Sequence, residues 1–257
     1  MNFSQVSFGL FSLDFFGLFV GFAFLAFSWG WYIQLGKNKL STDYFVHYFW
    51  RWVLVGILVG RIFEILLLVP NGSEISWISL FEFWDGGVSI YGFMIGSLSM
   101  MWYDFKKTDF KIMRWLDAAT FPLLYGLLIL DLGIYFTGAF YGTPTSLVWG
   151  IKYETIGVDI ISSIHPISIY ALVLHLLIFL WSRKKRVYLS QQFGALFMIV
   201  TSIVLISAFL LRFITSSDVV RLFNIIDLVQ IIQICIILSF LWALKVLKKK
   251  GIFDFFH

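Results

Sequence analysis

The chain has 257 residues, of which 60% are hydrophobic and 13% are charged, and its mean hydropathy is +0.89. A soluble domain carries roughly 25% charged residues, so this composition excludes an ordinary soluble enzyme and predicts an all-α integral membrane protein. The net charge of +4 comes mainly from short basic clusters between apolar segments, which we interpret as membrane-flanking charges and not as a nucleic-acid surface.

Seven apolar segments are candidates for membrane-spanning helices, which need about 20 residues to cross the hydrocarbon core. In chain order they cover residues 11–35, 50–69, 88–104, 115–137, 166–182, 193–212 and 223–246. The fourth is interrupted by Asp117, Asp131 and several glycines. No basic region or small-residue cleavage site marks the first segment as a signal peptide, so we expect it to be retained. We expect a single transmembrane domain over residues 1–257.

The basic residues between these segments predict the orientation. Apart from Arg61 inside the second segment, the chain has 18 lysines and arginines. Of these, 15 lie at or near the loop or tail that follows the first, third, fifth or seventh segment, and three lie at the other loops. Those three are Lys152, Arg212 and Arg221. Positive charge accumulates on the cytoplasmic side of a membrane. The pattern therefore predicts the N-terminus outside and the C-terminus in the cytoplasm, with the loops near residues 70–87 and 138–165 facing outward.

Arg61 lies inside the second segment, where a charged side chain is costly and usually faces the bundle interior with a partner. Glu64 follows three residues later, at a spacing that permits an ion pair within one helix. The alternative is that the planar guanidinium binds a lipid phosphate. Both interpretations stay open, and Arg61 is a candidate lipid-binding residue.

A glycine-rich run enters the third segment. Glycine lowers helix stability, so several close together need a physical reason. One reason is close helix packing, which small residues permit in membranes. The other is a lipid headgroup that approaches the backbone. On that interpretation Gly86, Gly87, Ser89 and Gly92 are candidate lipid-binding residues.

Asp131 in the fourth segment and His165 before the fifth are further candidates. A carboxyl group inside a span must pair with a basic group or carry a proton, and a catalytic role for Asp131 is also open. His165 precedes Pro166, which suits the first turn of a helix, so we expect His165 at the outer mouth of its segment. No set of histidines, cysteines or carboxylates has metal-ligand spacing, and the single cysteine, Cys235, excludes an intrachain disulfide.

Six motifs in chain order resemble those of the bacterial prolipoprotein diacylglyceryl transferase family. Gly60-Arg61-Ile62 is similar to the family's Gly-Arg-Ile/Leu, and residues 84–92 (WDGGVSIYG) resemble its Trp-x-Gly-Gly-Met-Ser-Phe-His-Gly. Residues 117–142 fit the family's long signature without a gap. The other three motifs are Phe15-Phe16-Gly17, residues 145–151 and residues 165–170.

The resemblance implies transfer of diacylglycerol from phosphatidylglycerol to the lipobox cysteine of a preprolipoprotein, with glycerol phosphate as the leaving group. It also implies phospholipid and prolipoprotein signal peptide as partners, no cofactor, metal or nucleic acid, and a place in the bacterial cytoplasmic membrane. Within the long signature, Gly133, Gly138 and Tyr141 join His165 as candidate lipid-binding residues.

Polar positions of the family differ in this chain. Tyr91 stands where the family has a histidine, and Asp131 stands where it has a phosphate-contacting arginine, so we retain both as candidate catalytic residues. Arg212 lies roughly 12 Å along the helix from the position of a second family arginine, too far for a simple replacement. The other replaced positions are Ile134, Thr137, Ala139 and Val204.

These differences leave three functions open. The chain could perform the family reaction, or it could be a catalytically impaired protein that binds lipid or a lipoprotein partner. It could also be an enzyme of altered lipid specificity that uses Arg61, Tyr91, Asp131 and Tyr141. A retinal protein is a poor fit because Lys245 lies at the membrane edge, where a Schiff-base lysine would need to lie mid-span.

Overall fold

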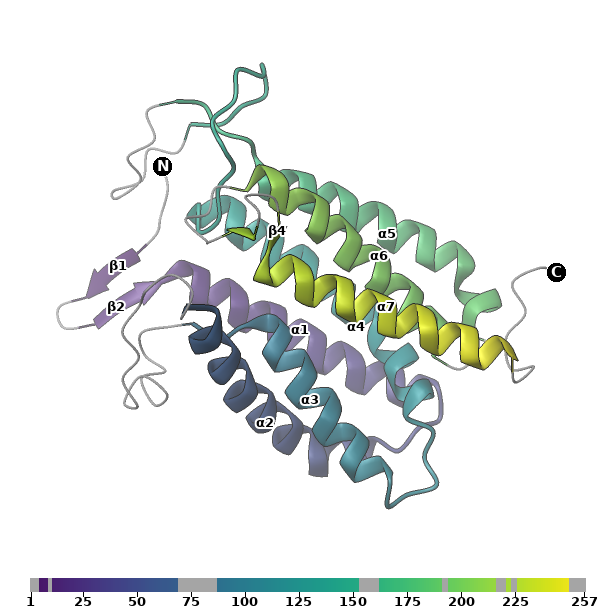
Figure 1. The fold of residues 1–257 in the computed structure, drawn as a ribbon. Helices are drawn as coiled ribbons and strands as arrows, with labels where there is room; N and C mark the ends of the chain where they lie inside the picture. The colour runs from purple at the N-terminus through teal and green to yellow at the C-terminus, as the bar shows by residue number, and fades with distance from the viewer. Residues whose placement is uncertain are drawn as a thin grey trace. The chain divides into compact units, whose positions relative to one another are not determined.

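The structure is a computed structural model that describes residues 5–8, 11–68, 87–152, 162–190, 194–215, 221–222 and 226–249. Within these residues it contains seven α-helices, one for each predicted segment (Figure 1). The helical class predicted from composition is therefore confirmed. The helices are α1 (Phe15–Lys37), α2 (Thr42–Leu68), α3 (Ile90–Phe105), α4 (Ile112–Thr137), α5 (Ile167–Ser190), α6 (Ala195–Leu211) and α7 (Leu228–Lys249).

The largest difference from a predicted helix start is at α2, which begins at Thr42 and not at residue 50. At α1 and α7 the helix starts later than predicted because a short antiparallel hairpin precedes each. Strands β1 (Gln5–Phe8) and β2 (Phe11–Asp14) come before α1, and β3 (Arg221–Leu222) and β4 (Ile226–Asp227) come before α7. The first predicted segment began at residue 11 and the last at residue 223. In β1 and β2 polar and apolar residues alternate, which is the period of a strand, and a hydropathy window does not detect that period.

Five of the seven helices are long and apolar enough to cross a membrane: α1, α4, α5, α6 and α7. Helix α2 carries Asp43, Arg51, Arg61 and Glu64. Helix α3 has 16 residues, and it is roughly 24 Å long at 1.5 Å per residue, against a hydrocarbon core of about 30 Å. The protein is a multi-pass helical membrane protein, and membrane crossing by α2 and α3 stays a prediction.

The chain divides into two compact units. Unit 1 comprises residues 1–34, 116–217 and 236–257, and unit 2 comprises residues 35–115 and 218–235. Helices α1, α4 and α7 each contribute residues to both units. The prediction of a single domain is left untested by this division.

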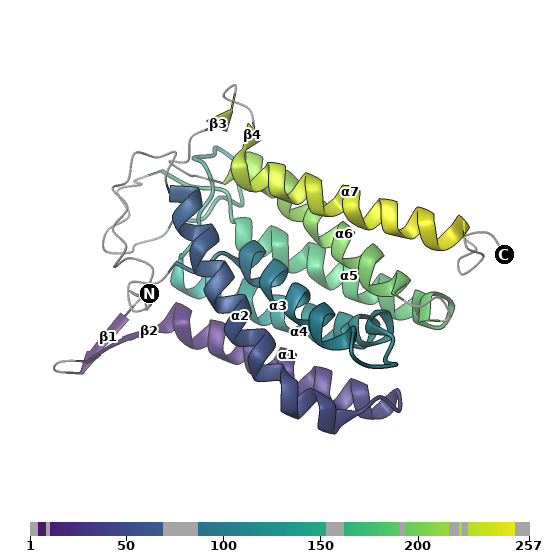
Figure 2. The same ribbon diagram turned by 60° about the horizontal axis from the view of Figure 1, so that its bottom comes forward.

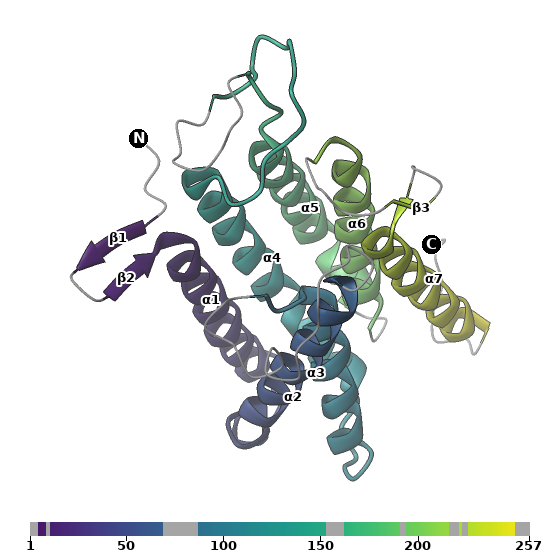
Figure 3. The ribbon, with the colours of Figure 1, turned by 60° about the vertical axis from the view of Figure 1, so that its left-hand side comes forward.

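In unit 1, helices α4, α5 and α6 lie side by side around a hydrophobic core (Figure 3). The buried members of that core are Phe121, Leu124, Ile178, Leu196 and Val200. The N-terminus of α6 is capped by a side chain from α4. Its N-cap is Gly194, which has no side chain, and the Asp117 carboxylate instead accepts hydrogen bonds from the backbone N–H groups of Gly194 at 2.6 Å and Phe197 at 3.0 Å. Asp117, which interrupts the apolar pattern, therefore satisfies the exposed amides of another helix.

In unit 2, helices α2 and α3 lie side by side (Figure 2). They pack through two pairs of glycines, each spaced by four residues: Gly56 and Gly60 on α2, and Gly92 and Gly96 on α3. A Cβ atom on Gly92 would lie 2.6 Å from the Phe63 Cβ and 2.8 Å from the Gly60 Cα. A Cβ atom on Gly96 would lie 2.8 Å from the Val55 carbonyl oxygen. The glycines allow the two helices to approach this closely, which supports the packing interpretation of the run. A lipid-binding role for Gly92 stays a prediction.

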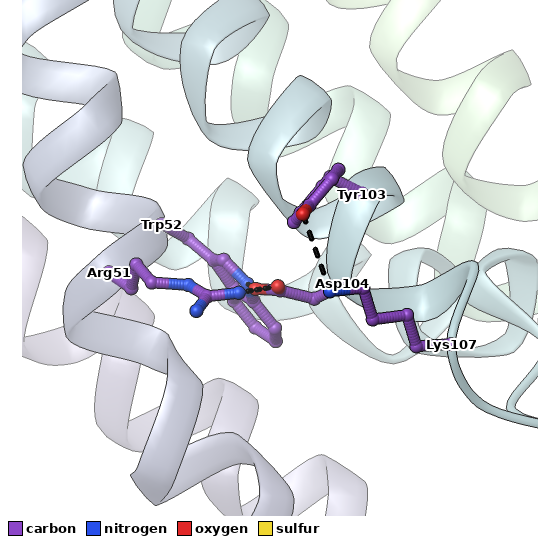
Figure 4. Close-up of polar contacts among 5 residues, drawn as sticks. All are labelled: Arg51, Trp52, Tyr103, Asp104 and Lys107. Carbon is purple, nitrogen blue, oxygen red and sulfur yellow. Dashed lines mark hydrogen bonds and ion pairs between the residues drawn. The ribbon is translucent and has the colours of Figure 1, made fainter.

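The C-terminal end of α3 is joined to α2 by a buried carboxylate (Figure 4). Asp104 accepts a hydrogen bond from the indole N–H of Trp52 at 2.7 Å and forms an ion pair with the half-exposed Arg51. Beside them, the Lys107 ammonium donates a hydrogen bond to the Tyr103 hydroxyl at 3.3 Å. Arg51, counted above as a membrane-flanking charge, thus also helps to fix the α2–α3 pair.

Candidate functional site

Arg61 lies on α2, and its side chain is turned into unit 2, where the residue is 8% exposed. Its Nη1 donates a hydrogen bond to the carbonyl oxygen of Gly87 at 2.9 Å. Gly87 has a φ of +78°, in the left-handed region that favours glycine. A Cβ atom there would lie 3.0 Å from the Arg61 Nη1 and 3.1 Å from the Glu64 Cγ. Both charged residues of the predicted pair therefore flank Gly87, and the guanidinium has the polar partner expected of a buried charge.

The segment that leads into α3 is tied to the same part of α2. Ser89 is the N-cap of α3 and is buried, and its backbone N–H donates to the carbonyl of Gly60 at 3.1 Å. The first-turn amides of a helix carry partial positive charge and bind anions. Arg61 and the start of α3 therefore form one positively polarised region. Gly86, also a candidate, lies outside the described residues.

Tyr91 occupies the second position of α3 and is bonded to α7. Its hydroxyl accepts a hydrogen bond from the Nε2 of Gln233 at 2.5 Å. The start of α7 is fixed by a reciprocal pair of bonds. The Asp227 N–H donates to the Gln230 side-chain oxygen at 3.0 Å, and the Gln230 N–H donates to the Asp227 carboxylate at 2.8 Å. This capping box holds the following turn, and with it Gln233, in place.

Asp131 pairs with a histidine of a neighbouring helix in unit 1. The His175 Nδ1 and the Asp131 Oδ2 are 2.6 Å apart, and both side chains are buried. The sequence leaves open whether Asp131 pairs with Arg61, pairs with another basic group or carries a proton, and in the structure its partner is His175 of α5. Sequence reasoning assigned His175 no role, although a histidine within an apolar span needs a polar partner in the same way as an aspartate.

The outer-loop candidates lie beside the ends of α4 and α5. Gly138, with a φ of +66°, follows the last residue of α4. A Cβ atom on Gly142 would lie 2.5 Å from the His165 Cβ, so the segments that contain Gly142 and His165 are in close contact. His165 precedes α5 as predicted, and its Nδ1 lies 3.4 Å from the Tyr170 hydroxyl. Tyr141 is half-buried next to this contact.

The candidate residues thus fall into two groups. Arg61, Gly87, Ser89, Tyr91 and Gly92 belong to unit 2. The unit 1 group contains Asp131, Gly133, Gly138, Tyr141 and His165. Gly133 is a packing position, since a Cβ there would overlap Phe19. Within the described part of the chain, no three histidine, cysteine, aspartate or glutamate side chains could hold a metal ion.

Two residues bear on the family arginine expected in the sixth segment. Val204 packs against the hydrophobic core of unit 1, so this position holds an apolar side chain. Arg212 begins a short 3₁₀ turn (Arg212–Ile214) that follows α6.

Sequence reasoning missed Gln230 and Gln233. The signal present was Asp227-x-x-Gln230 before an apolar run, which is the pattern of a helix start.

These features define a multi-pass helical membrane protein with buried polar pairs and a positively polarised helix start. Residues 4–246 match the family model described as prolipoprotein diacylglyceryl transferase. The chain belongs to the prolipoprotein diacylglyceryl transferase family.

Several curated relatives carry the name phosphatidylglycerol–prolipoprotein diacylglyceryl transferase. One from Polynucleobacter asymbioticus is 27% identical over 200 residues, which is 71% of this chain and 73% of the relative. One from Polynucleobacter necessarius is 28% identical over 182 residues, 66% of each chain. One from Cupriavidus metallidurans is 30% identical over 142 residues, 52% of this chain and 51% of the relative. Most of these matches span about half to two thirds of the relative's length.

Proposed function

We propose that this protein transfers a diacylglyceryl group from phosphatidylglycerol to the cysteine of a prolipoprotein. Family membership and the substrates in the relatives' names support the reaction class. The observation that carries the proposal for this chain is the buried Arg61 guanidinium bonded to Gly87 at the start of α3. A guanidinium beside a helix N-terminus is suited to the phosphate of a phospholipid.

The chemistry of the reaction explains why a cation is needed. The cysteine thiol loses its proton to water or buffer, and its sulfur forms a bond to the carbon of the diacylglyceryl group that carries the phosphate. The carbon–oxygen bond to the phosphate breaks, and its electron pair stays on the departing glycerol phosphate. Negative charge therefore grows on the phosphate, and a fixed positive group lowers the barrier. On this proposal Arg61 and the first-turn amides of α3 bind the phosphate and stabilise that charge.

The proposed topology brings this region to the side where the substrates meet. We propose one domain of seven membrane-spanning helices in the bacterial cytoplasmic membrane, with the N-terminus outside and the C-terminus inside. In that orientation α3 and α7 both start at the outer face, and Arg61 lies near the outer end of α2. A prolipoprotein signal peptide presents its cysteine at that face, and phosphatidylglycerol reaches it from the outer leaflet.

A transfer assay tests the proposal. Purified protein is mixed with phosphatidylglycerol and a lipobox peptide, and the thioether product is measured by mass spectrometry. Arg61→Ala is expected to lower the rate by about 10²–10³-fold, and Arg61→Lys to restore part of it because the charge remains and the fork is lost. Arg51→Lys is the control on the same helix, because it replaces the other guanidinium of α2 while keeping the positive charge that pairs with Asp104; it is compared with Arg61→Lys. Equal rates for Arg61→Ala and wild type would contradict the proposal.

A second candidate function is lipid binding without transfer. The observation that favours it is the engagement of the replaced polar positions with protein groups: Tyr91 with Gln233, and Asp131 with His175. A phenol is a poor base at neutral pH. Binding of phosphatidylglycerol with no thioether product would support this function. Transfer from a different phospholipid would instead support an enzyme of altered specificity.

A further inference from the structure

The loop between α4 and α5 in unit 1 carries a tight turn at residues 147–150 with apolar side chains at its centre. The Gly150 N–H donates to the Leu147 carbonyl at 3.0 Å, so Val148 and Trp149 occupy the two central positions. Val148 is 99% exposed, Trp149 59% and Leu147 40%. Single exposed apolar residues are common on protein surfaces, but turns are usually built from glycine, proline, asparagine, aspartate and serine. Three consecutive exposed apolar residues here indicate a surface that an apolar medium covers.

The 147–150 turn is held by the chain that leads into α5. The Thr145 N–H donates to the Ser163 carbonyl at 2.7 Å, and Ile151 and Ile164 exchange two backbone hydrogen bonds at 3.0 and 2.9 Å. At the base of the turn, a Cβ atom on Gly150 would lie 2.9 Å from the Ser163 Cβ. The turn therefore cannot fold back to bury its apolar side chains without breaking these contacts.

A hydrogen bond fixes the level of the turn relative to the membrane. The Trp149 Nε1–H donates to the Tyr170 hydroxyl at 2.8 Å, and an indole N–H can only donate. Tyr170 belongs to the first turn of α5, whose apolar stretch covers the 19 residues Ile167–Lys185. Such a stretch is roughly 28 Å long at 1.5 Å per residue, close to the hydrocarbon thickness of about 30 Å. The start of α5 therefore lies at the edge of the hydrocarbon, and the Trp149 indole lies beside it.

The side chains of the turn suit this level. Tryptophan is enriched at the membrane–water boundary because its large apolar ring carries one polar N–H. The N–H of Trp149 is already bonded to Tyr170, so the ring can leave water without an unmet donor. Lys152 is exposed just beyond the turn. A long basic side chain can keep its ammonium among anionic headgroups while neighbouring residues enter the membrane.

We infer that the 147–150 turn inserts Val148 and Trp149 into the headgroup region of the leaflet at which α5 starts. In the proposed orientation this is the outer leaflet, from which phosphatidylglycerol is drawn. The insertion tethers to the lipid surface the loop that carries Tyr141 and His165. The inference goes beyond the transfer reaction and does not depend on it, because it follows from the turn and from its bond to α5.

Depth-dependent fluorescence quenching tests the insertion. The single cysteine is removed as Cys235→Ser, and Val148→Cys in the full chain is labelled with an environment-sensitive dye. The protein is reconstituted into vesicles of phosphatidylcholine and phosphatidylglycerol, with iodide on both sides as the aqueous quencher. A nitroxide carried near the lipid headgroup should quench the label more strongly than one carried deep in the acyl chain, and iodide should quench it weakly. The side chain of Val148 is fully exposed, so the substitution should not affect folding.

Two control positions calibrate the measurement. Asp109→Cys lies in the exposed loop between α3 and α4, and its label should be quenched by iodide more strongly than by either nitroxide. Leu177→Cys is exposed on α5 roughly 15 Å from the helix start, and its label should be quenched most by the deep nitroxide. A Val148 label that follows the Asp109 pattern would overturn the inference. Protection from iodide only after a lipobox peptide is added would also overturn it, since the turn would then be a peptide-binding surface.

Discussion

The close approach of α2 and α3 at Gly92 gives the sharpest stability prediction. Gly92→Ala adds a Cβ atom 2.6 Å from the Phe63 Cβ and 2.8 Å from the Gly60 Cα. Carbon atoms that are not bonded prefer a separation of about 3.5–4.0 Å. The obstacle is backbone and Cβ, which no rotamer change can remove. The helices must therefore separate by roughly 1 Å at this point, and the neighbouring contact at Gly96 opens with them.

The expected magnitude follows from two opposing contributions. Alanine in place of glycine stabilises a helix interior by roughly 0.5–1 kcal/mol. Forcing a methyl group into a filled interface destabilises by about 1–3 kcal/mol, and the upper part of this range applies because backbone must move. The net loss is about 1–2 kcal/mol. The matched control is Gly21→Ala in α1, where a Cβ atom would meet nothing within 4 Å. The control should gain the helix contribution, so the two variants should differ by about 2–3 kcal/mol.

Reversible unfolding of the purified protein in mixed detergent micelles, followed by helical circular dichroism, measures this difference. Gly92→Ala should unfold at lower denaturing-detergent fraction than wild type, and Gly21→Ala at the same or a higher fraction. Equal unfolding of the two alanine variants would refute the reasoning, because it would mean that the α2–α3 contact at Gly92 is not tight.

Three further predictions concern the buried polar groups and the topology. Asp104→Ala should destabilise the protein by about 2–4 kcal/mol in the same assay, because the buried Trp52 N–H loses a charged acceptor, and Asp104→Asn should be milder because its amide oxygen can still accept. His175→Leu alone should destabilise the protein by about 3–5 kcal/mol, because it leaves the buried Asp131 without its partner. Replacing both His175 and Asp131 with leucine should recover most of that loss. Additive losses of the two single variants would show that the pair is uncoupled. A reporter fused after Lys250 should be active only if it functions in the cytoplasm, and activity of an export-dependent reporter there would overturn the proposed orientation.

Hydropathy predicted the order and approximate position of every helix because each helix is an apolar run of nearly sufficient length. It was wrong at the start of α2, which begins at Thr42 and not at residue 50, and at the starts of α1 and α7, where the described structure has short strands at residues 11–14 and 226–227. A window average is insensitive to alternation, so a strand with apolar residues at every second position looks like the start of a span. The rule that a charge inside a span needs a partner also held for Arg61 and Asp131.

The partners themselves could not be read from the sequence. The Arg61 contact joins residues 26 positions apart, and the Asp131 contact joins residues 44 positions apart. Such pairs depend on how helices pack, which local spacing does not encode. Gln233 is the clearest case, since its bond to Tyr91 spans 142 positions. The two glutamines of α7 share a helix face, and two amides on one side of a span are a sequence signal of a buried polar contact that sequence reasoning did not use.

The bond from Asp117 to the start of α6 has a consequence for how the helices come together. The carboxylate is synthesised about 80 residues before the amides that it caps. Until α6 arrives, α4 carries a carboxylate without these two donors. When α6 docks, only one alignment satisfies both, because a slip of one residue moves an amide by about 1.5 Å along the axis and 100° around it. The two bonds of Asp117 therefore favour one register and one rotation of α6 against α4. Apolar packing alone would define that alignment less sharply.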